Sequence, residues 1–261
     1  MGLIDTHCHL TFEQLADDID DIIERSKAAG VAGWVTVGTD AQENRKAVEL
    51  ANRFENMYAA VGIHPHDAKD VTAGTIAELK ELAKNEKVVA IGEIGLDFHY
   101  NLSPQQEQRR AFAGQLRIAS ELNLPVIIHC RDAFDETIDV LEQFGTGVKR
   151  GVFHCFDGSA EQAKIALGKG YYISFTGVVT FKNAEQNRQA AKIVPADRLM
   201  LETDCPYMSP EPVRKQKINE PAFMIHTARV LADLKGLGLS DFSQAVTATT
   251  RSFFNLPNRD I

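Results

Sequence analysis

The chain has 261 residues, of which 44% are hydrophobic and 25% charged, and its formal net charge is −8. This is the composition of a globular protein, and it excludes collagen-like and low-complexity chains. The negative charge argues against a protein that coats nucleic acid by charge alone. No apolar run reaches membrane-spanning length, and the N-terminus lacks the basic start and apolar stretch of a signal peptide. We therefore expect a cytoplasmic protein that does not enter membranes.

Short β-branched segments alternate with amphipathic stretches along the sequence. This alternation predicts parallel strands joined by right-handed helical crossovers. Eight strands are the number that a closed barrel requires, and the chain length suits a single α/β barrel. We therefore predict one TIM (β/α)₈ barrel domain over residues 1–261. The predicted strands are Leu3–Thr6, Trp34–Val37, Tyr58–Ile63, Val88–Ile91, Val126–Ile128, Gly151–Phe153, Tyr171–Phe175 and Leu199–Leu201.

The helices between these strands follow from apolar residues near helical spacing. Ser103 and Pro104 are typical of a helix start, with the serine as the cap and the proline in the first turn. An open doubly wound sheet is the alternative architecture, but it would show a glycine-rich turn after the first strand, where this chain has His7 and His9. The predicted helices include Ala16–Ala29, Gln42–Phe54, Glu107–Leu122, Ala222–Leu234 and Phe242–Phe254.

Imidazole and carboxylate side chains stand at or just after the ends of the predicted strands. In a parallel barrel these ends converge on one face, where active sites are built. A single histidine in such a place is most often a packed or surface residue, so only the joint pattern carries weight. Buried charges are costly unless they are paired or bind metal, so the set predicts a pair of divalent cations. Its members are His7, His9, Glu93, His129, His154 and Asp204.

The spacing also indicates how the two cations would be shared. His7 and His9 are two residues apart on a strand, so both point to one face and bind one cation. Glu93 has two carboxylate oxygens and is able to bridge two ions, while His129 and His154 complete the second. Imidazole and carboxylate ligands suit zinc and also manganese, or magnesium if waters fill the remaining positions.

The four cysteines do not resemble a metal site. They form no CxxC pair, and without an export signal we expect them to be reduced. Each directly follows one of the predicted ligands, so strand alternation turns its thiol away from the cluster. We interpret them as small buried hydrophobic residues. They are Cys8, Cys130, Cys155 and Cys205.

Six motifs then match a known family in order and spacing: IDTHCHL, GIHPH, GEIGLDFH, PVIIHCRDA, GVFHCFDGS and LETDCPY. Together they resemble the TatD family of metal-dependent deoxyribonucleases, which belongs to the amidohydrolase-like barrels. The resemblance implies hydrolysis of DNA phosphodiester bonds, at ends or in single strands. It also implies two sets of ligands. One cation would be held by His7, His9, Glu93 and Asp204, and the other by Glu93, His129 and His154.

Two carboxylates are candidates for roles around the attacking water. Asp204 is able to accept the proton of that water as a general base, although it is equally compatible with a role as a metal ligand alone. Glu202 lies two residues before Asp204 and faces the same way. We predict that Glu202 orients a ligand histidine.

Substrate contacts are predicted from two motifs. Arg131 lies two residues after His129 and offers a guanidinium fork for phosphate, or else a salt bridge to a nearby aspartate (Asp97, Asp132 or Asp135). His66 is assigned to substrate binding, and His64 to packing in the pocket.

The loop residues Arg214, Lys215 and Lys217 would receive further phosphates or form a solvated surface. Four loop aromatics would stack on a base or cap the barrel: Phe98, His99, Tyr100 and Tyr207.

Three functions are compatible with this pattern. The first is a nuclease with DNA as its substrate and a metal-activated water. The second is a metal-dependent hydrolase of a small amide, ester or aminoacyl bond, because the same metals polarise a carbonyl. The third is a metal-binding protein without activity, which the complete ligand set disfavours. We expect no obligate protein partner, and a monomer or weak homo-oligomer.

Overall fold

A computed structural model describes residues 2–257 of the chain. Its eight strands follow one another in chain order in a single sheet, β1 to β8. The strand pairings whose register is defined are all parallel. This is the (β/α)₈ barrel that the sequence predicted. Within residues 2–257, no helix combines the length and the apolar character that crossing a membrane demands.

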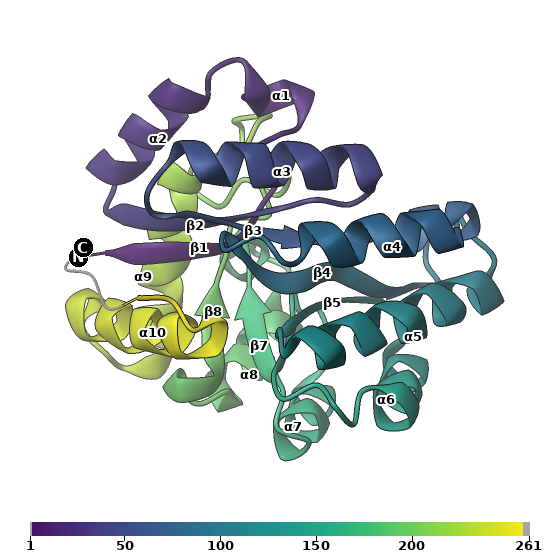
Figure 1. Cartoon of the computed structure of the whole chain (residues 1–261). Coiled ribbons are helices and arrows are strands. Elements are labelled where there is room, and N and C mark those ends of the chain that lie inside the picture. The colour runs from purple at the N-terminus through teal and green to yellow at the C-terminus, as the bar shows by residue number, and fades with distance from the viewer. Residues whose placement is uncertain (1, 258–261) are drawn as a thin grey trace. The chain divides into compact units, whose positions relative to one another are not determined.

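The contacts within the chain divide it into two compact units. One unit comprises residues 2–36 and 155–257, and the other comprises residues 37–154. Both contain strands that alternate with helices along the chain (Figure 1). The single domain over residues 1–261 stays a prediction.

In the first unit, helices pack on the strands at the two ends of the chain. α10 packs against β1 and β8, α9 packs against β8, and α7 packs against β7. The Thr247 hydroxyl in α10 donates a hydrogen bond of 2.9 Å to the Gly2 carbonyl, which ties the two ends of this unit together. The elements are β1 (Leu3–Cys8), α1 (Glu13–Ala16), α2 (Ile19–Ala28), β2 (Val31–Val37), α7 (Ala160–Gly168), β7 (Tyr172–Phe175), η2 (Gly177–Thr180), α8 (Glu185–Ile193), η3 (Ala196–Arg198), β8 (Leu199–Leu201), η4 (Pro221–Phe223), α9 (Met224–Lys235) and α10 (Leu239–Phe254).

The segment after β8 runs beside the end of β1 in the same unit. The Asp204 N–H donates to the His7 carbonyl at 2.9 Å, and the His9 N–H donates to the Cys205 carbonyl at 2.8 Å. These backbone hydrogen bonds place residues about 200 positions apart in the sequence side by side, and they do not depend on the side chains of those residues.

In the second unit, α3 packs on β3, α5 packs on β4, and α6 packs on β4 and β5. Buried amide side chains from the helices hold the ends of these strands. Asn44 in α3 exchanges two hydrogen bonds with the Gly62 backbone, and Gln115 in α5 exchanges two with Ile63. The elements are α3 (Ala41–Arg53), β3 (Met57–Val61), η1 (Pro65–Asp70), α4 (Ala73–Leu82), β4 (Val88–Asp97), α5 (Gln105–Leu122), β5 (Val126–Arg131), α6 (Phe134–Phe144) and β6 (Gly151–Phe153).

Several predicted boundaries were wrong. The strand predicted to end at Ile91 continues to Asp97, because the glycines in GEIG allow close approach of the neighbouring strand and do not end the extended backbone. The helix predicted over Ala16–Ala29 begins only at Ile19, as α2, and Ala16 is the last residue of the short helix α1. Ser103 does not cap α5, which makes no side-chain cap hydrogen bond. Its hydroxyl donates instead to the His66 carbonyl at 2.6 Å.

Gly95 in β4 is required by the close approach of β5. Its φ is +150°, and an added Cβ would lie 1.9 Å from the carbonyl oxygen of His129. We predict that Gly95→Ala lowers the free energy of unfolding by about 3 kcal/mol, because the added methyl group clashes with backbone that has little room to move. Urea denaturation would measure this loss.

Gly168→Ala is the matched control, since no heavy atom lies within 4 Å of a Cβ at this exposed end of α7. It should change the free energy of unfolding by less than about 1 kcal/mol. Equal unfolding midpoints for the two variants would contradict the packing described for β4 and β5.

Candidate active site

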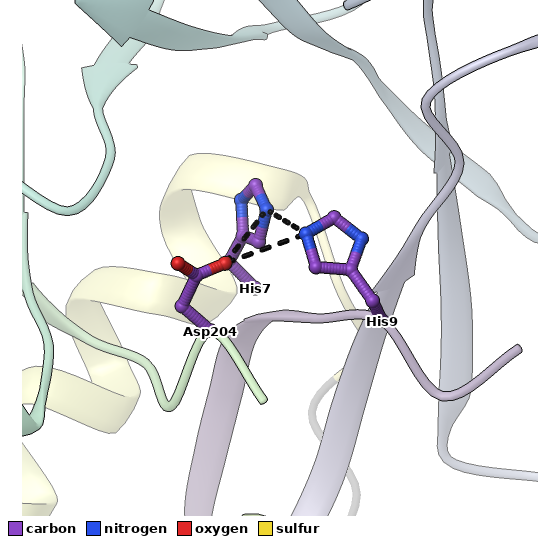
Figure 2. A group of neighbouring side chains, drawn as sticks. All are labelled: His7, His9 and Asp204. Atoms are coloured by element: carbon purple, nitrogen blue, oxygen red, sulfur yellow. Dashed lines mark hydrogen bonds and ion pairs between the residues drawn. The ribbon is translucent and has the colours of Figure 1, made fainter. Parts of the chain in front are cut away.

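The first group of metal-ligating side chains consists of His7, His9 and Asp204 (Figure 2). The two Nε2 atoms are 3.2 Å apart, and Asp204 Oδ1 lies 3.6 Å from His7 Nε2 and 3.4 Å from His9 Nε2. All three residues are buried. β1 supplies His7 and leads directly into His9, while Asp204 follows β8. The structure therefore brings together three of the predicted ligands.

The spacing of these three atoms fits a divalent cation. Nitrogen and oxygen ligands about 2.0–2.2 Å from a tetrahedral Zn²⁺ lie about 3.3–3.6 Å from one another. The observed separations of 3.6 and 3.4 Å lie within that range, and the separation of 3.2 Å between the two imidazoles lies just below it. Two imidazoles and one carboxylate are also a donor set that Zn²⁺ and Mn²⁺ accept.

A buried carboxylate that the sequence analysis overlooked holds this group in place. Asp5 is fully buried, and its two oxygens accept hydrogen bonds from the Thr203 N–H at 2.9 Å and the Thr203 hydroxyl at 2.6 Å. The same carboxylate lies 3.4 Å from the His7 N–H. Burial raises the pKa of Asp5 to about 7. Asp5 thus connects β1 to the residue before Asp204, whose φ of 53° is in the left-handed region.

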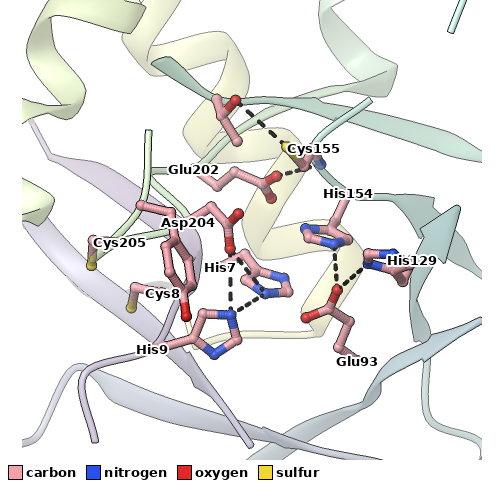
Figure 3. Close-up of polar contacts among 12 residues, drawn as sticks. His7, Cys8, His9, Glu93, His129, His154, Cys155, Glu202, Asp204 and Cys205 are labelled. Atoms are coloured by element: carbon pink, nitrogen blue, oxygen red, sulfur yellow. Dashed lines mark hydrogen bonds and ion pairs between the residues drawn. The ribbon is translucent and has the colours of Figure 1, made fainter. Parts of the chain in front are cut away.

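The second group is centred on Glu93 in β4 (Figure 3). Its Oε1 atom lies 2.6 Å from His129 Nδ1 and 2.7 Å from His154 Nε2. His129 belongs to β5, and His154 directly follows β6. The three predicted ligands of the second cation therefore meet at one carboxylate oxygen.

His64 belongs to this second group as well. Its Nε2 lies 3.4 Å from Glu93 Oε1 and 3.3 Å from His129 Nδ1, and ligand atoms of these three residues all lie within 4.8 Å of one another. Its position after β3 was visible in the sequence, but the residue was assigned to packing. The structure makes it a further candidate ligand.

Asp97 is the residue of this group that the sequence analysis missed. It is fully buried, and its Oδ2 lies 3.1 Å from His129 Nε2 and 3.0 Å from His66 Nε2. A carboxylate that accepts from one ring nitrogen of a histidine leaves the other nitrogen available to a cation. Gln108 fixes Asp97 in turn, because its amide exchanges hydrogen bonds with the Asp97 N–H and carbonyl. In GEIGLD, Asp97 stands four residues after Glu93, and this spacing is the sequence pattern from which its place in the group could have been predicted.

Electrostatics keep the carboxylates of this group ionised. Burial by itself would raise the pKa of Glu93, but the neighbouring imidazoles outweigh it and hold the pKa well below its ordinary value. Hydrogen bonds likewise outweigh burial for Asp97 and hold its pKa low. Burial lowers the pKa of His64 to about 4, so this imidazole is neutral at neutral pH. An ionised carboxylate and a neutral imidazole are the forms that bind metal.

Glu202, Cys8 and Cys155 belong to the same unit as the first group. One oxygen of Glu202 accepts from the Cys155 N–H at 2.5 Å (Figure 3), and its carboxylate lies within 4.8 Å of a ring nitrogen of His7. That Glu202 orients a ligand histidine stays a prediction. Burial raises the pKa of the Cys8 and Cys155 thiols well above the ordinary value, so they remain protonated, as expected for packed residues.

The predicted substrate residues lie next to Asp97. His66 Nε2 contacts its carboxylate, and Arg131 pairs with Asp97 in the register of β4 and β5. The Arg131 guanidinium lies 5.0 Å from the centre of the Tyr100 ring. Over the part of the chain that is described, Arg131 forms no ion pair, so the salt bridge to a nearby aspartate is not observed.

Comparison with known sequences supports the same chemistry. Residues 4–255 match the family described as "TatD related DNase". The chain is 42% identical over 254 residues to the uncharacterized metal-dependent hydrolase YabD of Bacillus subtilis, with 97% of this chain and 99% of that protein covered. It is 38% identical over 258 residues to the 3'-5' ssDNA/RNA exonuclease TatD of Escherichia fergusonii, with 97% and 99% covered.

Solved structures agree. The TatD homologue YjjV of Escherichia coli superposes with a TM-score of 0.92 at 30% identity, covering 98% of both chains. A TatD family hydrolase of Entamoeba histolytica superposes with a TM-score of 0.89 at 25% identity, again covering 98% of both chains.

Asp5 offers a direct test of how the first group is held. We predict that Asp5→Ala lowers the free energy of unfolding by about 3 kcal/mol, because two buried donors of Thr203 lose their acceptor. Asp5→Asn keeps an acceptor for the Thr203 N–H and should lose less than half as much. Urea denaturation of both variants measures the difference. Asparagine has nearly the same volume as aspartate and retains an acceptor, so equal losses would contradict the role given to the Thr203 N–H hydrogen bond.

Proposed function

The chain belongs to the TatD-related deoxyribonuclease family, and from this premise we propose that it is a 3'-5' exonuclease acting on single-stranded DNA or RNA. As a TatD-type protein it is a metal-dependent hydrolase, and the bond cleaved would be a phosphodiester. The observation that carries the proposal is the pair of ligand groups, buried except for the partly buried His129, each of which combines a carboxylate with imidazoles.

Each group would hold one divalent cation. We assign His7, His9 and Asp204 to the first cation, and Glu93, His129 and His154 to the second. The donor sets suit Zn²⁺, Mn²⁺ or Mg²⁺. That Glu93 also binds the first cation, and so bridges the two, stays a prediction from the family resemblance.

The residues divide the chemical work among them. When bound, paired divalent cations acidify a water and stabilise negative charge on phosphate oxygens. Asp204 is the proposed general base, since its carboxylate is ionisable and its Oδ1 faces the ring nitrogens of His7 and His9. Asp97 keeps His129 in a single orientation through the hydrogen bond to Nε2. Ligands held in this way need little rearrangement during the reaction.

Two further residues are proposed to contact the substrate. Arg131 would bind a phosphate with its guanidinium fork, and the Tyr100 ring holds this group in place. His66 would contact the substrate through its other ring nitrogen, because Nε2 is engaged by the Asp97 carboxylate. A cytoplasmic location, the absence of an obligate protein partner, and a monomer or weak homo-oligomer stay predictions.

Hydrolysis of end-labelled single-stranded DNA tests this function. We predict shortening of the DNA from its 3' end, loss of activity with a chelator, and recovery with Mn²⁺, Mg²⁺ or Zn²⁺. Glu93→Ala should lower kcat by on the order of a thousandfold, because the charge stabilisation supplied by a cation is worth several kcal/mol. Glu86→Ala, an exposed change just before the same strand, is the matched control and should leave kcat unchanged.

Other outcomes would favour the alternatives. Intact DNA together with metal-dependent release from a panel of small esters and amides would indicate the second function. An absence of turnover with every metal and every substrate would indicate a metal-binding protein without activity.

A further inference from the structure

An exposed aromatic ring lies beside the first ligand group. Tyr207 follows Asp204 by three residues and is 50% exposed. Its ring centre lies 6.5 Å from that of His9, whose Nε2 faces Asp204. Half of the Tyr207 side chain is therefore open to solvent directly beside the ligand group.

The backbone that carries this ring is fixed. The Tyr207 N–H donates to the Asp204 carbonyl at 3.0 Å, and the amide of fully buried Asn219 donates to the Tyr207 carbonyl at 2.7 Å. The same amide donates to the Thr203 carbonyl at 3.0 Å. The turn from Thr203 to Tyr207 is therefore held through main-chain atoms. Changing the Tyr207 side chain leaves all of these hydrogen bonds in place.

A second ring supports the first. Phe12 stacks on His9 with 4.6 Å between ring centres and 11° between planes. Tyr207 meets Phe12 edge to face, with centres 6.3 Å apart and planes at 76°. Such pairs prefer this arrangement and are worth about 1 kcal/mol beyond burial. Phe12 thereby limits the positions open to the Tyr207 ring and orients it before any ligand arrives.

We propose, resting on the function proposed above, that Tyr207 is a stacking platform for an unpaired nucleobase of the substrate, next to the phosphodiester that is cleaved. A preoriented exposed ring beside metal ligands matches the way in which single strands are held without sequence preference. A base inside a duplex is stacked on both faces and is not available to such a ring. The platform therefore favours single strands or frayed ends over duplex.

Tyr100 is the competing candidate, since it is 55% exposed. Its ring is already engaged by the Arg131 guanidinium at 5.0 Å and by the His66 and His99 rings, whose centres lie 5.6 and 4.9 Å away. Tyr100 lies beside Arg131 and His66, whereas Tyr207 lies beside the metal-ligating residue His9 itself. Tyr100 therefore serves as the matched comparison for Tyr207.

The experiment measures cleavage of single-stranded oligonucleotides at the terminal phosphodiester. The reference substrate has normal residues on both sides of this bond, and each abasic substrate lacks the base on one side of it. Unmodified protein should cleave one of the abasic substrates with kcat/KM about tenfold lower than the normal one, which is the usual scale of base–aromatic stacking. Tyr207→Leu should raise KM for the normal substrate about tenfold, change kcat little, and abolish the preference. Tyr207→Phe should retain the preference.

The comparison separates this inference from the proposed function. Failure of the unmodified protein to cleave any oligonucleotide would overturn both. Cleavage without a preference for the base, or a preference that survives in Tyr207→Leu, would overturn the stacking platform alone. A preference lost only in Tyr100→Leu would place the platform at that residue and contradict the assignment to Tyr207. Thermal unfolding of each variant verifies that it folds.

Discussion

Burial of carboxylates among imidazoles is the constraint on which the rest of this structure depends. Glu93 and Asp204 are both buried, and each faces the ring nitrogens of two or more histidines at hydrogen-bonding or slightly longer distances. A buried anion is costly unless a compensating charge lies close by. Divalent cations would supply that compensating charge and would also take part in hydrolysis. Glu93 lies within β4 and Asp204 follows β8, and the family match agrees with a metal-binding role.

Behind the ligands, a further set of buried polar groups fixes their positions. Asp5 links β1 to the residue before Asp204, and Asp97 accepts from His129, while Gln108 holds Asp97 by its backbone. The hydrogen bonds of Asp5 and Gln108 are buried, and the one between Asp97 and His129 is partly buried. Leaving a buried partner unsatisfied is expensive. The ligand positions are thus set by the folded chain itself. In contrast, the Tyr207 side chain is half exposed, while its backbone is held by Asn219.

Strand count and strand order followed from the sequence, because short β-branched segments alternate with amphipathic stretches along the chain. The extent of the strands was harder to predict. β4 was predicted to end at Ile91, so Asp97 was expected in a loop and not on the same strand as Glu93. The strand continues because Gly95 allows close approach of the neighbouring strand and does not end the extended backbone. Asp5 lay inside a predicted strand. No local sequence pattern predicts that its carboxylate accepts hydrogen bonds from Thr203, about 200 positions away. The exposure of Tyr207 depends on how a long loop folds, which local patterns do not determine.

Anomalous X-ray scattering from crystals grown with Mn²⁺ is the most direct measurement of whether both buried groups bind metal. The account predicts two anomalous peaks per chain, one within bonding distance of His7, His9 and Asp204 and another within bonding distance of Glu93 and its histidines. A single peak at saturating Mn²⁺, or peaks away from these side chains, would contradict it.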